Sequence, residues 1–422
     1  MTKNEKNACP FRGIFALLLS LFLLITSTGI TAYSQEKAFK EESVLTESQY
    51  EDAVEAAALA VPKNPTGMPV EVRAKAALLM DATTGRVLLK MREHDKLFPA
   101  SVTKIMTLLL VAEAVDSGKI ELTDVVTASA NAASKGGSQI WLKEGETMTV
   151  DELLRATAIY SANDACTALG EFISGSEEAF IALCNDRAEE LGMKDTHFDN
   201  CTGLDDTTDT HLTSAYDIAL MSRELLKHEM IINYTTVWMD SLRGGQTELV
   251  NTNKLVRFYK GTTGLKTGTT SKAGCCLSAT ALREGTHLIA VVLGSSSSDD
   301  RFNGAKAMLN WGFSNFETVT PSIDKALITD VSVIKGVDEI IKPVLPEIKP
   351  ILISRGRQDD LQQQVEIAVD VAAPVEKGQK LGSVKITLDG ETVGEYDLTA
   401  PKSVAKLTFG VVFMRMLRAL CR

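Results

Sequence analysis

Three short motifs lie in order through the middle of this 422-residue chain: Ser-Val-Thr-Lys at 101–104, Ser-Ala-Asn at 161–163 and Lys-Thr-Gly at 266–268. A serine hydroxyl is a weak nucleophile and needs a base within hydrogen-bond reach. Alone, such motifs are usually an exposed helix face, a turn and a hairpin end. Together and in this order, they predict one active site in which a lysine activates a serine for acyl transfer.

The first motif supplies the nucleophile and its base. Residues three apart share a helix face, so Ser101 and Lys104 meet if this segment is helical. Pro99 just ahead and the apolar run 105–111 predict a helix that is buried in a core. Burial disfavours an ammonium and lowers a lysine pKa, which makes Lys104 a general base. Lys266, as a second cation nearby, would act in the same direction.

The second motif adds a hydroxyl and an amide. Residues 151–157 have the pattern of a helix whose end would deliver the motif on a turn, where short polar residues are favoured. Ser161 is predicted to relay a proton between Lys104, the leaving amine and Lys266. Asn163 is predicted to hold Lys104 and to donate to the amide carbonyl of a substrate.

The third motif is typical of a strand edge that a ligand backbone approaches closely. Lys266, with Thr267 or Thr269, could hold a terminal carboxylate, and Gly268 leaves room for the substrate. The oxyanion of a tetrahedral intermediate needs two preorganised donors. We expect the backbone N–H groups of Ser101 and Thr269 to supply them.

The match to a known family extends beyond the three motifs. The chain resembles the D-alanyl-D-alanine carboxypeptidases of the low-molecular-mass penicillin-binding protein type, close to the DacF-like branch of spore-forming bacteria. The similarity covers residues 70–318 and, in outline, the C-terminal third. It is carried by Met80–Leu88, Phe98–Thr107, Tyr160–Ala165, Leu191–Phe198, Thr202–Leu204, Gly264–Thr270 and Ala273–Gly274. Ala162 stands where many relatives have glycine.

The resemblance implies a serine-type enzyme that removes the terminal D-alanine from peptidoglycan stem pentapeptides through an acyl-enzyme on Ser101. It also implies inhibition by β-lactam antibiotics and a role in cell-wall peptidoglycan, including the spore cortex. In relatives, a late arginine of the catalytic domain helps to hold the substrate carboxylate, and Arg301 is the candidate. The alternative for Arg301 is a solvated loop arginine.

Composition excludes several other classes. A net charge of −11 argues against a nucleic-acid partner, which needs a basic surface. The chain has no Gly-rich phosphate loop, and its five histidines do not cluster at metal spacing. We therefore expect neither a metal nor a cofactor. The seven cysteines do not form a disulfide framework, and most are predicted to be small core residues, although one bridge remains possible.

Five segments are predicted along the chain. A positive region, an apolar core at 14–25 and a small-x-small site at 32–34 are typical of a secretory signal peptide, with an uncleaved anchor as the alternative. The protein is therefore expected at the extracytoplasmic face of the cell membrane. The segments are a signal peptide at 1–34, an acidic lead-in at 35–70, the catalytic domain at 71–318, a β-rich domain at 319–401 and an amphipathic helix at 402–422.

The fold class expected for the catalytic domain is α/β (α+β), similar to serine β-lactamases and transpeptidases, with an antiparallel sheet flanked by helices. Strands are predicted at 76–80, 87–90, 274–281 and 287–294, and a helix at 301–313. The β-rich domain is predicted from alternation at 326–334, 365–371 and 380–388, with turns at 377–378 and 389–390.

The C-terminal segment has no acidic residue after Lys402. Arg415, Arg418 and Arg422 fall on one helical face and apolar side chains on another, which predicts a helix lying in a membrane interface. The alternative is a helix that docks on the β-rich domain. The segment is too short to span a bilayer.

Other functions share part of this chemistry. A class A β-lactamase would carry a Glu-x-x-Leu-Asn motif, which the sequence lacks. A transpeptidase shares all three motifs but usually has larger accessory domains, and endopeptidase activity stays open. A non-catalytic wall-binding scaffold would be signalled by loss of Ser101, Lys104 or Lys266, and all three are present.

Overall fold

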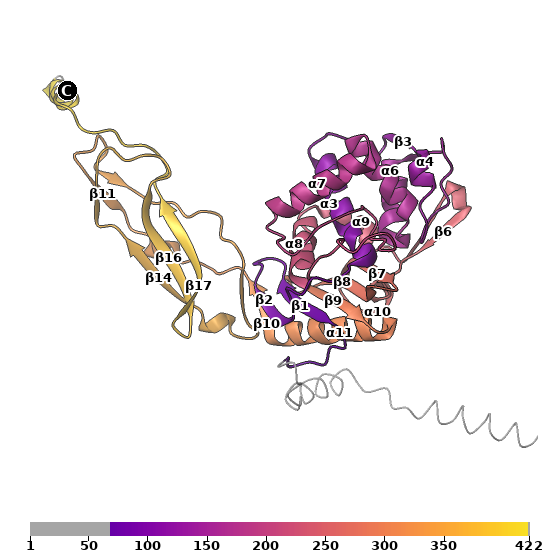
Figure 1. The fold of residues 1–422 in the computed structure, drawn as a ribbon. Coiled ribbons are helices and arrows are strands. Elements are labelled where there is room, and N and C mark those ends of the chain that lie inside the picture. The colour runs from indigo at the N-terminus through magenta and orange to yellow at the C-terminus, as the bar shows by residue number, and fades with distance from the viewer. Residues whose placement is uncertain (1–67, 421–422) are drawn as a thin grey trace, which may run out of the picture. The chain divides into compact units, whose positions relative to one another are not determined.

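The computed structural model describes residues 68–420 (Figure 1). The predicted signal peptide and all but the last three residues of the predicted lead-in lie outside the described residues.

The centre of the catalytic region is a five-stranded antiparallel sheet with the order β2-β1-β9-β8-β7. The strand that carries Lys-Thr-Gly, β7, is at one edge, as the third motif predicts. Residues 284 and 285, between β8 and β9, both have positive φ, which suits a tight hairpin turn. The strands are β1 (Ala76–Asp81), β2 (Val87–Met91), β7 (Thr262–Thr270), β8 (Gly274–Arg283) and β9 (Thr286–Ser295).

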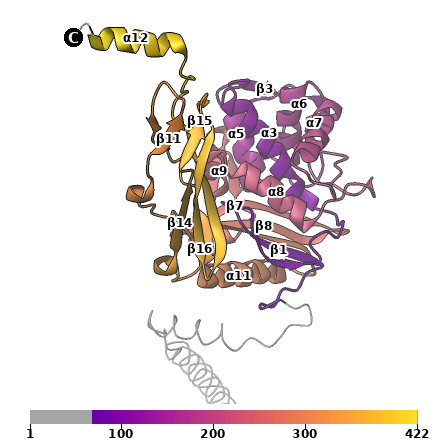
Figure 2. The same cartoon turned by 90° about the vertical axis from the view of Figure 1, so that its left-hand side faces the viewer.

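Alternate residues along the strands of the sheet pack into two different hydrophobic cores, one on each face. In β9, Ile289 and Val291 pack with the large helical region, whereas Leu288 and Val292 pack with helix α11 (Ser298–Asn315) on the opposite face. This is the two-residue period of a strand that is buried on both sides. Figure 2 shows α11 beneath the sheet, with α3 and α8 above it.

The helical region covers the other face of the sheet, and α3 lies at its centre, buried along most of its length. Helix α3 includes the apolar run 105–111 and is buried, as predicted for the segment that follows Ser101. Two short pairs of antiparallel strands that the sequence did not predict join this region, β3 with β4 and β5 with β6. The helices are α3 (Lys104–Asp116), α4 (Ala130–Ala133), α5 (Val150–Arg155), α6 (Asn163–Ser174), α7 (Glu177–Glu190), α8 (Ala215–Leu225), α9 (Ile232–Thr235) and α10 (Leu255–Phe258). The strands of these pairs are β3 (Val125–Thr127), β4 (Thr147–Thr149), β5 (Met239–Leu242) and β6 (Thr247–Val250).

The β-rich region forms small sheets around two apolar clusters. The run predicted at 380–388 is strand β16, and Asp389 and Gly390 form the predicted turn with positive φ at both positions. The run at 326–334 is a strand only from Val331, because residues 325–327 form a 3-10 turn. The strands are β10 (Phe316–Val319), β11 (Val331–Ile334), β12 (Ile340–Ile341), β13 (Ile351–Ser354), β14 (Gln362–Ile367), β15 (Asp370–Ala372), β16 (Lys380–Leu388) and β17 (Glu391–Thr399).

The ends of the β-rich region differ from the predicted limits. Strand β10 pairs with β13, so the boundary expected between residues 318 and 319 falls inside a strand of this region. Val404 and Lys406 still form bridges to Val375 and Gly336. The last helix, α12 (Phe409–Leu420), therefore begins later than expected. No helix within residues 68–420 combines the length and apolarity needed to cross a membrane.

Candidate active site

The backbone around Ser101 is tightly confined. Residues 100–103 form a 3-10 turn that continues into α3, and Ala100 has a positive φ of 50°. A Cβ on Gly203 would lie 1.8 Å from the carbonyl oxygen of Ala100, and a Cβ on Gly268 would lie 2.9 Å from the backbone nitrogen of Ser101. Only glycine fits at such approaches. The nucleophile turn is therefore packed between the 202–204 loop and the edge strand β7.

Lys104 is completely buried, and its ammonium nitrogen points back at the serine. Nζ donates to Ser101 Oγ at 2.9 Å and to the backbone carbonyl of Thr202 at 2.8 Å. Burial lowers the pKa of Lys104 to about 8. At pH 7 about a tenth of the amine is therefore neutral. That amine already contacts the hydroxyl it would deprotonate.

Ser161 follows a five-residue π-helix, 156–160, that the sequence did not predict. The chain reverses at Ser161 in the left-handed region, with φ 69°, and α6 begins two residues later. Serine tolerates this conformation less well than glycine, and π-helical turns are frequent at functional sites. The motif therefore lies on a turn, as expected, and Ser161 is nearly buried.

The contacts of Asn163 differ from the expected ones. Its side-chain nitrogen donates to the carbonyl of Gly136 at 2.7 Å, and its backbone nitrogen donates to the carbonyl of Ser138 at 2.7 Å. The amine of Lys104 is held by the Thr202 carbonyl, which takes the place predicted for Asn163. The buried Oδ1 of Asn163 has no hydrogen-bond partner among the described residues, so an acceptor is available to a ligand N–H.

Lys266 is the second buried lysine of the site. Its Nζ donates to the carbonyl of Thr267 at 3.0 Å, and the Thr267 hydroxyl donates to Thr252 Oγ1 at 2.7 Å. Burial, followed by repulsion from Lys104 and Arg301, lowers the pKa of Lys266 well below its usual range. Burial and mutual repulsion therefore disfavour the state in which Lys104 and Lys266 are both protonated.

Arg301 lies on α11 and is only 7% exposed, so the alternative of a solvated loop arginine is wrong. Its Nη1 donates to the carbonyls of Gly268 at 2.9 Å and Cys276 at 3.2 Å and to Thr269 Oγ1 at 3.0 Å. The guanidinium therefore fixes the edge strand behind the third motif. Burial lowers its pKa, but an arginine remains charged.

Two contributors to the site were missed in the sequence. The carbonyl of Thr202 holds Lys104, and the hydroxyl of Thr252 holds Thr267. Thr202 belongs to a segment that carried the family resemblance, but a backbone carbonyl leaves no side-chain signal of its role.

The five described cysteines, at 166, 184, 201, 275 and 276, are all free thiols. Four of them are buried, as the prediction of small core residues requires, and Cys275 is partly exposed. None of them lies where the nucleophile is expected.

Comparison with known proteins agrees with this geometry. Residues 61–297 match the family profile described as D-alanyl-D-alanine carboxypeptidase, and residues 316–406 match the one described as penicillin-binding protein 5, C-terminal domain. The D-alanyl-D-alanine carboxypeptidase DacF of Bacillus subtilis is 42% identical over 346 residues, which cover 81% of this chain and 88% of the relative. DacC of Escherichia coli is 35% identical over 341 residues, which cover 79% and 84%.

Solved structures give the same result. Penicillin binding protein 5 from Haemophilus influenzae is 30% identical with a TM-score of 0.72, and the match covers 80% of this chain and 99% of that protein. Penicillin-binding protein D2 from Listeria monocytogenes in its ampicillin-bound form is 29% identical with a TM-score of 0.53, over 57% of this chain and 98% of that protein. The chain belongs to the D-alanyl-D-alanine carboxypeptidase family, serine-type penicillin-binding enzymes that act on the peptidoglycan of the cell wall.

Proposed function

We propose that Ser101 is the nucleophile that removes the terminal D-alanine of a peptidoglycan stem pentapeptide, with Lys104 as its base. The observation that carries this proposal is the 2.9 Å contact between Lys104 Nζ and Ser101 Oγ, made by a fully buried amine with a pKa of about 8. A nucleophile paired with a base of suitable pKa is what acyl transfer requires.

Acylation then proceeds by addition and elimination through a tetrahedral intermediate. Neutral Lys104 takes the proton of Ser101 Oγ, and that oxygen attacks the carbonyl carbon between the two D-alanines. The tetrahedral oxyanion is held by the backbone N–H groups of Ser101 and Thr269. The peptide C–N bond breaks, D-alanine leaves as an amine that receives its proton through Ser161, and the rest of the peptide remains as an ester on Ser101.

The substrate carboxylate would lie between the third motif and Arg301. Lys266, Thr267 and Thr269 face it, and the Arg301 charge behind Thr269 adds to the attraction. An anion beside Lys266 favours the ammonium form of that lysine. The ammonium of Lys266 would in turn disfavour a proton on Lys104. Substrate binding would therefore increase the fraction of Lys104 that is neutral and able to act as the base.

Hydrolysis of the ester completes the cycle. Lys104, again neutral after passing its proton to the leaving group, takes a proton from water, and the resulting hydroxide attacks the ester carbonyl. A β-lactam presents a similar amide and carboxylate, so we infer that it also acylates Ser101. The relative from Listeria monocytogenes is described in ampicillin-bound and cefotaxime-bound forms, which supports this inference.

Transfer of the acyl group to an amine is a second candidate activity. The DD-transpeptidase of Streptomyces K15 matches this chain with a TM-score of 0.54 at 26% identity, over 58% of the chain and 98% of that protein. Addition of a D-amino acid to the assay would reveal transfer as a new peptide product. We place hydrolysis first because the curated relatives are carboxypeptidases.

The proposal includes export and attachment to the outer face of the cell membrane. The apolar segment at 14–25 supports export. Helix α12 supports attachment, because it has no buried residue and exposes Phe409, Phe413, Met416 and Leu420 together with basic side chains. The resemblance to the DacF-like branch extends the proposed substrate to spore cortex peptidoglycan.

The test is release of D-alanine from diacetyl-Lys-D-Ala-D-Ala by the wild type and by Ser101→Ala, each also treated with a labelled penicillin. The proposal expects both release and labelling by the wild type and neither by the variant. Labelling without release would contradict the carboxypeptidase assignment, and activity of the variant would contradict the assignment of Ser101.

A further inference from the structure

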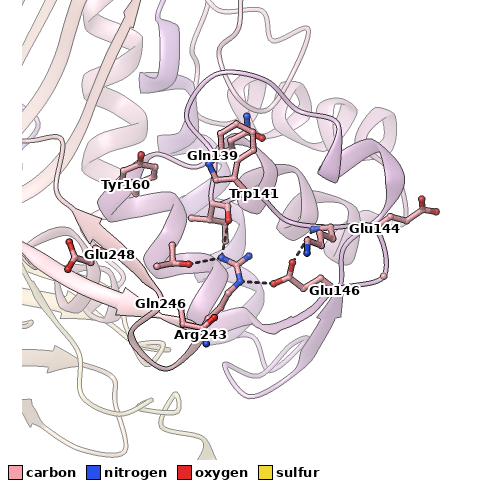
Figure 3. Close-up of a pocket in the computed structure, with 12 residues that line it drawn as sticks. Gln139, Trp141, Glu144, Glu146, Tyr160, Arg243, Gln246 and Glu248 are labelled. Carbon is pink, nitrogen blue, oxygen red and sulfur yellow. Dashed lines mark hydrogen bonds and ion pairs between the residues drawn. The ribbon is translucent and has the colours of Figure 1, made fainter.

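A hollow of about 790 Å³ lies beside the second motif, and none of its lining residues has a role in the proposed mechanism (Figure 3). It is formed by the loop 139–146, by the β5–β6 hairpin and by Tyr160, which directly precedes Ser161. The most prominent side chain of the hollow is Trp141, which is 73% exposed. A tryptophan is normally well buried, so one displayed in a polar hollow is unusual.

The backbone holds Trp141 in this exposed position. The N–H groups of Ile140 and Leu142, on either side of it, donate to the two carboxylate oxygens of Asp164 at 3.1 and 2.9 Å. Ile140, Leu142 and Asp164 are all buried, and Trp141 itself has φ 60°. Asp164 follows Asn163 directly. The tryptophan is therefore fixed by the same turn that carries the second motif, as a preorganised binding group would be.

Of the charged side chains that line the hollow, Arg243 and Glu146 form an ion pair, whereas Lys143, Glu144 and Glu248 form none among the described residues. Arg243 Nε donates to Glu146 at 2.7 Å, and its Nη1 donates to the carbonyl of Ile140 at 2.9 Å and to Thr247 Oγ1 at 2.8 Å. Its Nη2 is buried without a partner among the described residues. Figure 3 shows Arg243 and Glu146 in the hollow below Trp141. The hollow thus offers an aromatic face and an unused donor, without a strong net charge.

We propose that this hollow binds the sugar rings of the glycan strand to which the stem peptide is attached. A pyranose has an apolar C–H face that packs on an aromatic ring and a rim of hydroxyl and acetamide oxygens that accept hydrogen bonds. The sugar is uncharged where its lactyl group is linked to the peptide, which fits a hollow whose positive and negative side chains nearly balance.

The sugar and the scissile bond belong to one short substrate, because three residues separate the D-alanine that acylates Ser101 from the sugar. Tyr160 lies next to Ser161 in sequence, so the hollow begins one residue from the catalytic turn. This inference rests on the proposed function, since it concerns the remainder of the same substrate.

The experiment compares two substrates, a disaccharide-linked pentapeptide and the same pentapeptide without sugar, by the KM and kcat of D-alanine release. For the wild type, the sugar should lower KM. Trp141→Ala should raise KM for the disaccharide substrate about five- to tenfold with kcat nearly unchanged, and should leave the free pentapeptide unaffected. Trp141→Phe should retain most of the effect. Phe258→Ala removes another exposed aromatic side chain, outside the hollow, and is the matched control. It should leave KM unchanged for both substrates.

If Trp141→Ala raised KM equally for both substrates, the hollow would bind peptide and the proposal would be overturned. If Trp141→Ala changed KM for neither substrate, the proposal would also be overturned. If the wild type released D-alanine from neither substrate, the proposed function would fail on its own. Fluorescence titration with the β-1,4-linked tetramer of N-acetylglucosamine would then decide this inference separately. Quenching that Trp141→Ala abolishes would support it, and no quenching in the wild type would refute it.

Discussion

The amine of Lys104 lies 2.9 Å from the hydroxyl of Ser101, although the lysine side chain has no exposed surface. Among the described residues, the only other acceptor for that amine is a backbone carbonyl, that of Thr202, and no carboxylate forms an ion pair with it. A buried ammonium with only neutral partners is unfavourable. The fold therefore stabilises the neutral amine.

The rate of acylation should rise with pH. With a pKa of about 8, Lys104 is mainly protonated at pH 6 and mainly neutral above pH 9. Since only the neutral amine accepts the serine proton, the rate of penicillin acylation at pH 6 should be about a hundredfold below its high-pH plateau. Stopped-flow measurement of labelling between pH 6 and 10 tests this. A rate independent of pH, or one that falls as pH rises, would argue against Lys104 as the base.

Lys104→Met should lose activity and gain stability. Acylation should fall by a factor of about 10² to 10⁴, because the base is missing. The folded pKa is lower than the unfolded value of 10.5, so the unfolded chain binds more protons between about pH 8 and 10.5 and wild-type stability increases with pH in that window. The advantage of the variant should therefore be largest below pH 8, on the order of 3 kcal/mol, and should vanish above about pH 10.5.

Chemical denaturation of both proteins at pH 7 and pH 10 measures this difference. A variant less stable than the wild type at pH 7 would show that the ammonium contributes favourable contacts. The pKa of Lys104 would then not be lowered in the folded protein.

Gly203→Ala should distort the nucleophile turn. The new Cβ would lie 1.8 Å from the carbonyl oxygen of Ala100, and φ at this position is 87°. We expect a loss of more than about 2 kcal/mol in the free energy of unfolding, together with slower penicillin labelling. The matched control is Gly118→Ala, which has a φ of 71° and nothing within 4 Å of the new Cβ. That variant should lose only about 1 kcal/mol and keep its labelling rate. Equal losses in the two variants would contradict a close approach at residue 203.

Arg301→Gln should weaken substrate binding more than it slows catalysis. The guanidinium holds the backbone carbonyl of Gly268 and the hydroxyl of Thr269, and it contributes positive charge behind them. We expect KM for D-Ala-D-Ala peptides to rise by about tenfold or more with a smaller change in kcat, and Arg301→Lys to be intermediate. A fall in kcat with KM unchanged would indicate that Arg301 affects the reacting groups and not the carboxylate site.

Removal of the residues from Phe409 onward should release the protein from anionic membranes. The wild type, expressed without residues 1–34, should float with vesicles that contain phosphatidylglycerol, and high salt should reduce this binding because arginines take part. The shortened chain should stay unbound and should keep its activity on soluble peptides. Flotation that does not depend on α12 would contradict the anchor.

The local pattern of the sequence predicted the elements that have strong periodicity. The β8–β9 hairpin, the β1–β2 hairpin and α3 follow from alternation, turns and a long apolar run. The same reasoning predicted that Ser101 and Lys104 meet, because their spacing brings them together within one helical turn.

What the sequence did not predict depends on long-range contacts and on the backbone. The amine of Lys104 donates to the backbone carbonyl of Thr202. Because every residue has a backbone carbonyl, only the fold determines which one lies next to Lys104. Arg301 was expected to help hold the substrate carboxylate, but the sequence did not predict that its Nη1 donates to the carbonyls of Gly268 and Cys276. The π-helix before Ser161 has no known sequence signature in the motif, and the β3–β4 and β5–β6 strands are too short for periodicity to detect.

The central claim is that Ser101 carries the acyl group, and trapping the intermediate tests it most directly. The purified protein would be incubated with a penicillin, quenched with acid, digested and analysed by mass spectrometry for the peptide that bears the adduct. We predict one penicilloyl group per chain, on the peptide that contains Ser101, and none in Ser101→Ala. An adduct on Ser161 or on any other residue, or an adduct that persists in Ser101→Ala, would contradict the mechanism.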